Sequence, residues 1–550
     1  MISSEYNRIG NVRQVTFSPN SEAEPAPRRS AGFQPAVSPT SNRLGVCLDV
    51  RVKKSEAPAG WKPAIQQVGS PRYAPSLKPA SEFGLKQPNC YRYALALGIG
   101  LLALAMLSSF PAMAESAREL QLAKPNVLFL LADDLRPDGI GALGNPHVKT
   151  PNLDKLVERG LIFNHAYVFG AHIGSVCVPS RTMIYTGCQL YNHKGYGSGK
   201  TTTLPQAMKA AGYATIRSGK FGANPNDLCK TFDVHLNGYN SANNASNIIA
   251  FIREHAGKQP MFLHMASNEP HDPQFAPPEY YPRYHAGELP LPVNFLPQHP
   301  FDDGEMIIRD EQTLPWPRTR AELTGKLARY YASTTYWDDH VGRIIKALKD
   351  TGQYENTLII IAGDNGLSLG EHGLLGKQNL YEFGGMHVPL VFVGPGIPKG
   401  KTDAFVYLMD ILPTVCELIG EKIPDGIDSQ SLAPVITGKA KKVRDYCFTS
   451  YTDVQRSIRD QRWKLIRYPK INFSQLFDLK NDPHEMRNLA EQPRQARKLK
   501  QMMGLLEQAQ KQYGDTCALT SEHPGVVKWS PPIKVASTTS EKLPAVKATP

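Results

Sequence analysis

Uninterrupted apolar runs in the middle of the chain predict strands that are covered on both faces. Residues 126–132 read N-V-L-F-L-L-A and residues 357–362 read T-L-I-I-I-A, and neither run alternates with polar residues. Alternation is expected where one face of a strand meets water, so a continuous apolar run indicates a buried strand. Residues 213–218, Y-A-T-I-R-S, and 261–266, M-F-L-H-M-A, are also predicted to form strands. The chain therefore offers at least four strands to one buried sheet.

Helical patterns lie between these runs. Within residues 321–350, apolar side chains recur three and four positions apart, which gives a helix one apolar face. Shorter helices are predicted from residue 151 and over residues 204–212. Strands that alternate with helices predict an α/β fold, a large and mostly parallel sheet sandwiched by helices. In such a fold, functional residues gather at the carboxyl ends of the strands.

The pattern changes in the last quarter of the chain. Residues 462–468 and 475–479 predict short antiparallel strands, and residues 496–511 predict a helix with one polar face. We therefore expect a large α/β domain over residues 124–438 and a small C-terminal α+β subdomain with an antiparallel sheet over residues 439–515.

The two ends of the chain lack the pattern of a core. Residues 1–88 are rich in Pro, Ser, Ala and Arg and predict a disordered leader, and residues 516–550 predict a disordered tail. Residues 89–114 combine a basic flank, a short apolar stretch and an A-x-A ending, which indicates a signal peptide. A membrane anchor is the alternative, although the apolar stretch is short for spanning a bilayer. We therefore expect an exported protein, periplasmic or secreted.

Charge and cysteine content narrow the function classes. The chain has 62 Lys and Arg against 50 Asp and Glu, a net charge of +12, but no Lys/Arg-rich run, zinc-ligand spacing or helix-turn-helix pattern. No nucleic-acid partner is expected, and the modest positive balance suits an anionic substrate. The eight cysteines are irregularly spaced, so they define no disulfide framework.

Acidic and amide side chains directly follow two of the predicted strands. Asp133 and Asp134 come after the first apolar run, and Asp364 and Asn365 come after the run at 357–362. Either pair alone is usually a turn or a helix cap. Because neighbouring parallel strands end side by side, the four residues are predicted to meet. Four oxygen-bearing side chains without a cysteine or histidine cluster favour a hard cation, Ca²⁺ before Mg²⁺.

A short motif combines a potential nucleophile with a permanent cation. In residues 175–187, S-V-C-V-P-S-R-T-M-I-Y-T-G, Cys177 stands four positions before Arg181. Pro179 predicts an extended backbone just before it, and Ser180 could cap a helix whose N-terminus faces the cysteine. An anion there would meet backbone N–H groups, a helix dipole and a guanidinium. A lone cysteine is more often a small buried residue, but this arrangement favours a sulfate or phosphate site.

The C-x-P-S-R motif followed by T-G resembles the signature of the type I sulfatases, a family of the alkaline-phosphatase-like superfamily. The resemblance implies that Cys177 is converted to formylglycine by a formylglycine-generating enzyme and that the hydrated aldehyde is the nucleophile. It also implies a calcium site formed by Asp133, Asp134, Asp364, Asn365 and an oxygen of the modified Cys177.

Two lysines and a histidine complete the anion pocket that the resemblance implies. Lys220 lies in S-G-K, Lys377 in G-E-H-G-L-L-G-K-Q and His271 in P-H-D-P. A lysine taken singly is usually solvated surface, so the surrounding segments carry this assignment. The resemblance implies that Arg181 and Lys220 support the nucleophile. It also implies that Lys377 and His271 bind the sulfuryl group and that His271 protonates the departing alcohol.

One position departs from the family pattern. Sulfatases commonly have a histidine two or three residues after the first lysine, whereas Lys220 is followed by F-G-A-N. His172 and His193 are candidate replacements, although simple surface polarity is the ordinary role of His193, and the sequence does not assign His372. The departure leaves open a different base or a slow or inactive enzyme.

Together these patterns predict a sulfuric ester hydrolase that releases inorganic sulfate, with the resemblance spanning roughly residues 124–490. A sulfated polysaccharide or glycan is the preferred substrate, because the proline-dense residues 275–318 predict a long surface excursion near the mouth of the site. Two alternatives stay open, a phosphodiesterase or phosphonate hydrolase of the same superfamily and a catalytically impaired protein that binds sulfated glycans. The oligomeric state is not predicted.

Overall fold

The computed structural model describes residues 124–220, 228–238 and 240–532. Its strands are β1 (Asn126–Ala132), β2 (Leu161–Tyr167), β3 (Gly170–Ala171), β4 (Ala214–Gly219), β5 (Val234–Asn237), β6 (Met261–Ser267), β7 (Thr357–Gly363), β8 (His387–Val388), β9 (Leu390–Val393), β10 (Gly400–Tyr407), β11 (Cys447–Tyr451), β12 (Gln455–Arg459), β13 (Trp463–Tyr468) and β14 (Phe473–Asp478). Its α-helices are α2 (Pro151–Val157), α3 (Cys177–Thr186), α4 (Leu204–Ala210), α5 (Ser241–His255), α6 (Arg320–Asp350), α7 (Ile411–Leu418), α8 (Ala433–Ile436) and α9 (Ala496–Tyr513). The predicted leader and signal peptide or anchor lie outside the described residues.

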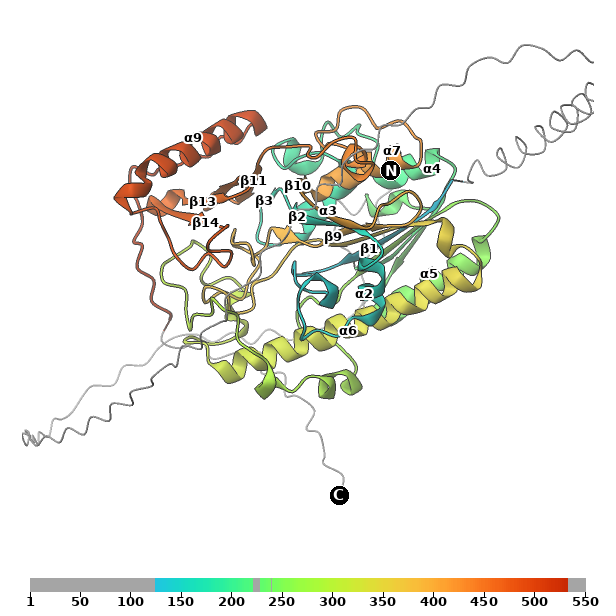
Figure 1. Ribbon diagram of the computed structural model, residues 1–550, viewed down its shortest axis with the longest axis horizontal. Coiled ribbons are helices and arrows are strands. Elements are labelled where there is room, and N and C mark those ends of the chain that lie inside the picture. The colour runs from blue at the N-terminus through green and yellow to red at the C-terminus, as the bar shows by residue number, and fades with distance from the viewer. Residues whose placement is uncertain (1–123, 221–227, 239, 533–550) are drawn as a thin grey trace, which may run out of the picture. The chain divides into compact units, whose positions relative to one another are not determined.

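A nine-stranded sheet is the central element (Figure 1). Its order is β10-β2-β9-β7-β1-β6-β4-β5, with β8 paired to β2. The strands from β7 to β5 are parallel, and β9 is antiparallel to both of its neighbours. Ala132, at the end of β1, lies opposite Gly363 at the end of β7 and Ser267 at the end of β6. The segments that follow these three strands therefore begin at one edge of the sheet.

The two faces of β1 contribute to different cores, which explains its uninterrupted apolar sequence. Val127, Phe129 and Leu131 join a core with side chains of α3, α4 and α7. Leu128 and Leu130 join a second core with side chains of α2, α5 and α6. Figure 1 shows these two sets of helices on opposite sides of the sheet. Since every residue of β1 is buried, the predicted sandwich of helices around a mostly parallel sheet is confirmed.

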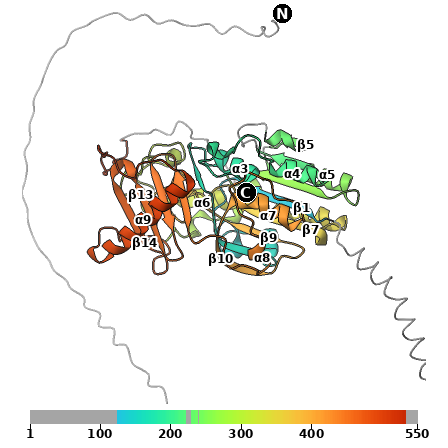
Figure 2. The same cartoon turned by 90° about the horizontal axis from the view of Figure 1, so that it is seen from above.

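The C-terminal region forms a second, smaller sheet in the order β14-β13-β12-β11-β3 (Figure 2). The strands from β11 to β14 pair antiparallel, and α9 packs on β12 and β13. The two-residue strand β3 pairs in parallel with β11 through Gly170 and Ala171. The small sheet therefore takes an edge strand from the segment just before Cys177.

Three features differ from the sequence-based expectation. Cys177 is the first residue of α3, so it is helical rather than extended. Residues 275–318 contain only short 3₁₀ helices, but Tyr280, Phe301 and other apolar side chains of this segment are buried, so it is more than a surface excursion. Residues 516–532, predicted as part of a disordered tail, pack on the folded region: Gly525 N donates to Lys470 O at 2.8 Å, among other contacts.

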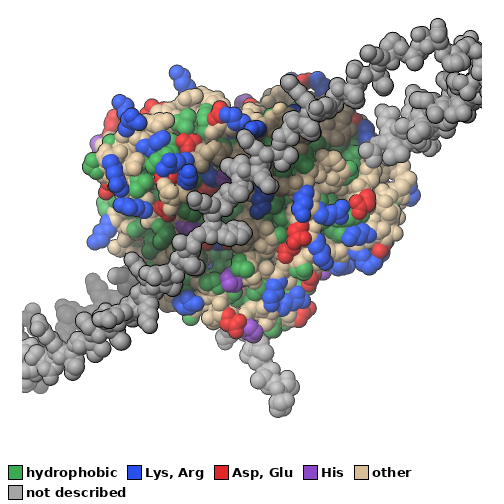
Figure 3. Space-filling view, viewed as in Figure 1, with side chains coloured by type: hydrophobic (Ala, Val, Ile, Leu, Met, Phe, Trp, Pro, Cys, Tyr) green, Lys and Arg blue, Asp and Glu red, His purple; other side chains and the backbone are tan. Residues whose placement is uncertain are grey.

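The remaining expectations concern cysteines, membrane helices and surface charge. Among the described residues, five cysteines are present as free thiols, namely Cys177, Cys188, Cys416, Cys447 and Cys517. Within the same part of the chain, no helix combines the length and apolar character needed to traverse a bilayer. On the face shown in Figure 3, Lys and Arg are interspersed with Asp and Glu.

Candidate active site

Four polar side chains meet where β1 and β7 end. Asp133 and Asp134 follow β1, Asp364 and Asn365 follow β7, and all four are buried. The backbone N–H of Asp134 donates to Asp364 Oδ1 at 3.2 Å, and Asn365 Nδ2 donates to Asp134 Oδ1 at 2.7 Å. Asp134 also has φ 63°, in the left-handed region that favours glycine. Such strain, of about 1–3 kcal/mol, persists where the surrounding fold over-determines it, commonly at functional sites.

The oxygen atoms of this group fit a divalent cation. Asp133 Oδ1 and Asn365 Oδ1 are buried and have no hydrogen-bond partner among the described residues. Ligand atoms of Asp133, Cys177 and Asp364 all lie within 4.8 Å of one another. Burial, followed by the charge of Asp133, raises the pKa of Asp364 to about 6. Crowded carboxylates and unpartnered buried oxygens indicate a site that a hard cation would complete.

Cys177 begins α3 and lies beside these carboxylates. Its predicted extended conformation was wrong because a proline within the first helical turn is tolerated, since the N–H groups there lack partners in the helix. Pro179 lies in that turn, and the N–H of Ser180 donates to Val176 O at 3.1 Å, so Ser180 is inside the helix rather than its cap. Burial and the charge of Asp133 raise the pKa of the Cys177 thiol to about 11. The unmodified side chain is therefore a neutral thiol at pH 7.

Arg181 bridges the ends of the two strands. It lies one turn after Cys177 on α3, on the same helix face. Its Nη2 is 2.8 Å from Asp133 Oδ2, and its Nε is 2.8 Å from Asp364 Oδ2, with all three side chains inaccessible to solvent. Although burial opposes the shift, the charges of Arg181 and Lys220 hold the pKa of Asp133 well below its ordinary value. Arg181 thus fixes the first residue of α3 relative to β1 and β7.

Two lysines approach the carboxylates from other segments. Lys220, directly after β4, places Nζ 2.7 Å from Asp133 Oδ2, and its side chain is 24% exposed. Lys377 places Nζ 2.6 Å from Asp134 Oδ1, and its side chain is only 3% exposed. Although burial opposes the shift, Asp134 and the other acidic groups raise the pKa of Lys377 well above its ordinary value. Both lysines are therefore positioned to meet an anion.

His271 reaches the group from the turn after β6. Its Nε2 is 3.8 Å from Asp134 Oδ2. Its Nδ1 is 2.7 Å from the carbonyl oxygen of Asp272, which can only accept, so Nδ1 carries a proton. This hydrogen bond directs Nε2 toward the carboxylates, where it can exchange a proton.

The structure thus brings the residues of the predicted metal and anion sites into one group, which we call the site cluster. It consists of Asp133, Asp134, Cys177, Arg181, Lys220, His271, Asp364, Asn365 and Lys377. The positions after Lys220, where the family histidine would stand, lie outside the described residues.

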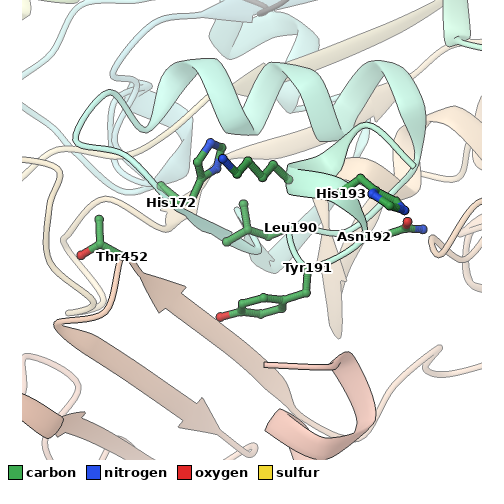
Figure 4. A pocket seen from close by; sticks show the side chains of 8 residues that line it. His172, Leu190, Tyr191, Asn192, His193 and Thr452 are labelled. Atoms are coloured by element: carbon green, nitrogen blue, oxygen red, sulfur yellow. The ribbon is translucent and has the colours of Figure 1, made fainter. Parts of the chain in front are cut away.

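The two candidate replacement histidines lie in a cavity beside α3. This cavity, about 390 Å³ in volume, is named here the His172 cavity (Figure 4). It is lined by Ala171, His172, Leu190, Tyr191, Asn192, His193, Lys194 and Thr452. His372, which the sequence left unassigned, is buried and stacks on Tyr381 with ring centroids 3.8 Å apart. Its Nε2 also lies 3.0 Å from Asn294 Nδ2, so His372 is held by stacking and hydrogen bonding outside the site cluster.

Sequence reasoning missed the residues that hold the Lys377 segment in place. Glu311, in the proline-dense segment, accepts hydrogen bonds from the backbone N–H groups of Leu375 at 2.9 Å and Gly376 at 2.8 Å. Gln378 Nε2 donates to Gly174 O at 3.0 Å and to an Asp310 carboxylate oxygen at 2.9 Å. These contacts join parts of the chain that are distant in sequence, so no local pattern signals them.

The sequence profile of the sulfatase family matches residues 125–421. The chain belongs to the sulfatase family. The match covers more than half of the chain. The protein is therefore a hydrolase of this family, within the alkaline-phosphatase-like superfamily. A second profile, described as the C-terminal region of N-sulphoglucosamine sulphohydrolase, matches residues 370–512.

Individual sulfatases are similar over most of their length. An arylsulfatase of Clostridium perfringens is 26% identical over 439 residues, covering 66% of this chain and 90% of the relative. An N-acetylglucosamine-6-O-sulfatase of Bacteroides thetaiotaomicron is 25% identical over 520 residues, covering 76% and 91%. A protein solved in complex with D-glucosamine-2-N,6-O-disulfate superposes with a TM-score of 0.61 at 23% identity, covering 73% of this chain and 100% of that one. The structural match shows a shared fold.

Proposed function

We propose that this sulfatase is exported and releases inorganic sulfate from a sulfated polysaccharide or glycan, using formylglycine at position 177 and a calcium ion. The observation that carries the proposal is the site cluster, in which Cys177 and Arg181 on one helix meet the carboxylates that end β1 and β7. Cations and carboxylates concentrated at one edge of a parallel sheet suit recognition of a tetrahedral anion with a metal ion.

The state of the Cys177 side chain supports modification. A thiol with a pKa of about 11 carries almost no thiolate at neutral pH and is a poor nucleophile. Cys177 is only 7% exposed, so we infer that a formylglycine-generating enzyme acts before the chain has folded. As the family resemblance implies, the hydrated aldehyde would supply the nucleophilic oxygen and release sulfate by C–O cleavage.

The cation would be held by Asp133, Asp134, Asp364 and Asn365, together with the modified side chain at position 177. Oxygen donors alone favour Ca²⁺, with Mg²⁺ as the less favoured candidate. When bound, the ion would withdraw charge from a sulfate oxygen and neutralise the crowded carboxylates.

The other side chains have distinct tasks in this proposal. Arg181 and Lys220 hold the nucleophilic group of residue 177, because both contact Asp133 beside it. Lys377 and His271 bind sulfuryl oxygens from the side of Asp134. When the S–O ester bond breaks, protonated His271 donates its Nε2 proton to the departing alcohol oxygen.

Substrate class and location are part of the proposal. The similarity to an N-acetylglucosamine-6-O-sulfatase supports a glycan substrate, and the irregular segment 275–318 adjoins the site cluster through Asp310 and Gln378. The signal-peptide pattern at residues 89–114 supports export to the periplasm or outside the cell.

Sulfate release from a panel of substrates tests this function. Mature protein with calcium is incubated with 4-nitrophenyl sulfate, desalted sulfated glycans and an aryl phosphate diester. We expect sulfate release that is lost in Cys177→Ala and retained in the control variant Cys517→Ala. Preferred turnover of the diester would instead indicate a phosphodiesterase. Glycan binding without sulfate release, despite confirmed conversion of Cys177, would indicate a binding protein.

A further inference from the structure

The His172 cavity is formed by the segments that immediately precede and follow α3. Figure 4 shows His172 and Thr452 at one end, Asn192 and His193 at the other, and Leu190 and Tyr191 between them. Its volume of about 390 Å³ lies within the range of sites that bind small ligands. Tyr191 packs edge-on to Phe169, with ring centroids 6.1 Å apart, so the middle of the cavity rests on the core.

The lining carries positive charge and no acidic side chain. Lys194 is exposed, and within the described parts of the chain its ammonium group forms no hydrogen bond or ion pair. Burial, together with the charge of Lys194, lowers the pKa of His172, so the imidazole is neutral at pH 7. The cavity therefore presents one unneutralised cation beside a neutral hydrogen-bonding ring.

The buried polar atoms of the lining that have no hydrogen-bond partner among the described residues include His172 Nδ1 and Thr452 Oγ1. His172 and Thr452 lie at the same end of the cavity. Buried polar atoms are nearly always paired, because burying them unpaired is costly. The backbone of Thr452 is fixed, since its carbonyl oxygen accepts a hydrogen bond from Arg456 Nη1 at 2.8 Å. A bound polar group would satisfy both atoms.

The backbone of the opposite end is strained. His193 has φ 50° and Lys194 has φ 60°, so two consecutive non-glycine residues occupy the left-handed region. Asn192 Nδ2 donates to Asp428 Oδ2 at 2.8 Å and ties this turn to a neighbouring segment. Backbone strain that the surrounding structure maintains is concentrated at ligand clamps and active sites.

We propose that the His172 cavity is a second anion subsite, which binds a sulfate or carboxylate group on a sugar next to the one that carries the reacting sulfate ester. The proposal rests on the proposed function and deepens it: the substrate would be a multiply charged oligosaccharide. Lys194 supplies charge, His172 and Thr452 supply hydrogen bonds, and Leu190 and Tyr191 offer an apolar surface to the sugar ring.

The position of the cavity fits this role. His172 precedes Cys177 by five residues, so their Cα atoms are separated by at most about 18 Å. An oligosaccharide of a few sugars can span such a distance, whereas a small aryl sulfate cannot. The subsite would therefore discriminate among glycans without contributing to the chemistry at Cys177.

Binding of matched disaccharides tests the subsite. The full chain with Cys177→Ala, which cannot consume the ester, is titrated by calorimetry in calcium. The probes are a disaccharide with one sulfate and no other charge, its disulfated counterpart, and its counterpart with one sulfate and one uronate. We expect one or both doubly charged probes to bind at least tenfold more tightly than the singly charged one, and the stronger of the two identifies the preferred anion.

Variants of Lys194 test whether the His172 cavity causes the difference in affinity between the doubly and singly charged probes. In Lys194→Met, the affinity ratio between doubly and singly charged probes should fall to near one, and Lys194→Arg should restore most of it. Lys200→Met, an exposed lysine in the same segment but outside the lining, should leave the ratio unchanged.

Equal affinity for all probes in the parent chain, a ratio that survives Lys194→Met, or failure of every probe to bind would overturn the proposal. Hydrolysis of 4-nitrophenyl sulfate by the unsubstituted mature enzyme is measured separately. It tests the proposed function alone, so the two failures remain distinguishable.

Discussion

The site cluster and a second buried group of charges differ in how completely their charges are paired. The second group, the junction cluster, contains Glu382, Arg459, Lys464 and Glu485 and joins the Lys377 segment to the small sheet. Lys464 Nζ lies 2.9 Å from a carboxylate oxygen of each glutamate, and Arg459 pairs with Glu382. Glu485 also accepts a hydrogen bond from the Glu382 backbone at 2.6 Å.

The difference separates a group built for stability from one built for ligands. The two cations and two carboxylates of the junction cluster contact one another directly. The site cluster instead leaves buried oxygens of Asp133 and Asn365 without partners, and Lys220 remains partly open to solvent. Both groups are costly to desolvate. In the junction cluster, Glu485 Oε1 accepts no well-formed hydrogen bond but is ion-paired with Lys464, whereas in the site cluster Asp133 Oδ1 and Asn365 Oδ1 have neither kind of partner among the described residues. We therefore expect changes in the site cluster to affect activity and changes in the junction cluster to affect stability.

The largest expected effect is the loss of activity in Asp364→Ala. This change removes a proposed cation ligand and the partner of Arg181 Nε, so kcat/KM should fall by at least about 1,000-fold. Kinetics on an aryl sulfate, with unfolding measured with and without calcium, would check it. Calcium should stabilise the parent chain but not the variant. Asp425→Ala, which alters an exposed ion pair, is the control. Near-normal activity in Asp364→Ala would contradict the assignment of activity to the site cluster.

Glu382→Ala should reduce the stability of the protein and leave its activity nearly unchanged. Removing one carboxylate leaves Arg459 and Lys464 buried without their partner, which typically costs about 3–5 kcal/mol. We expect this loss in chemical denaturation, with kcat/KM of the folded enzyme changed less than twofold. The exposed pair of Glu355 provides a control, since Glu355→Ala should cost almost nothing. A large kinetic defect with normal stability would reverse the assignment.

The sequence predicted the large sheet better than it predicted the charge pairs of the junction cluster or the pairing of β3 with β11. Apolar runs that end at acidic residues located β1 and β7, and the parallel arrangement then placed Asp133 and Asp364 together. In contrast, the pairing of β3 with β11 depends on packing between segments about 280 residues apart, and a two-residue strand has no periodicity. The junction cluster was missed for the same reason, because its residues resemble ordinary surface charges until the fold buries them.

A pH dependence of stability is expected from Glu485. Burial and the nearby charge of Glu382 outweigh Lys464 and raise the pKa of Glu485 from 4.5 to about 7. The folded state therefore retains a proton that the unfolded state releases, so this contribution to stability falls as pH rises from 4.5 to about 7. The stability difference between the parent chain and Glu485→Gln should shift by up to about 3 kcal/mol in favour of the variant. Denaturation at pH 5 and pH 8 measures it, and a pH-independent difference would refute it.

The smallest effect is expected at Glu311, which acts on the site through backbone contacts. Glu311→Gln should weaken the hydrogen bonds to Leu375 and Gly376 and loosen the segment that carries Lys377. A decrease of about 10-fold in kcat/KM is expected. The melting temperature should also fall, because the change neutralises the buried partner of Arg318. Glu288→Gln, on the same proline-dense segment but exposed, should leave both unchanged. Unchanged kinetics in Glu311→Gln would show that Lys377 does not depend on this support.

Peptide mass analysis of residue 177 in active enzyme tests the central claim most directly. Preparations made with increasing amounts of formylglycine-generating enzyme should contain increasing fractions of aldehyde at this position. We expect the rate of sulfate release to rise in proportion to that fraction and to vanish when only the thiol is present. Full activity in a preparation whose residue 177 is entirely unmodified cysteine would contradict the account.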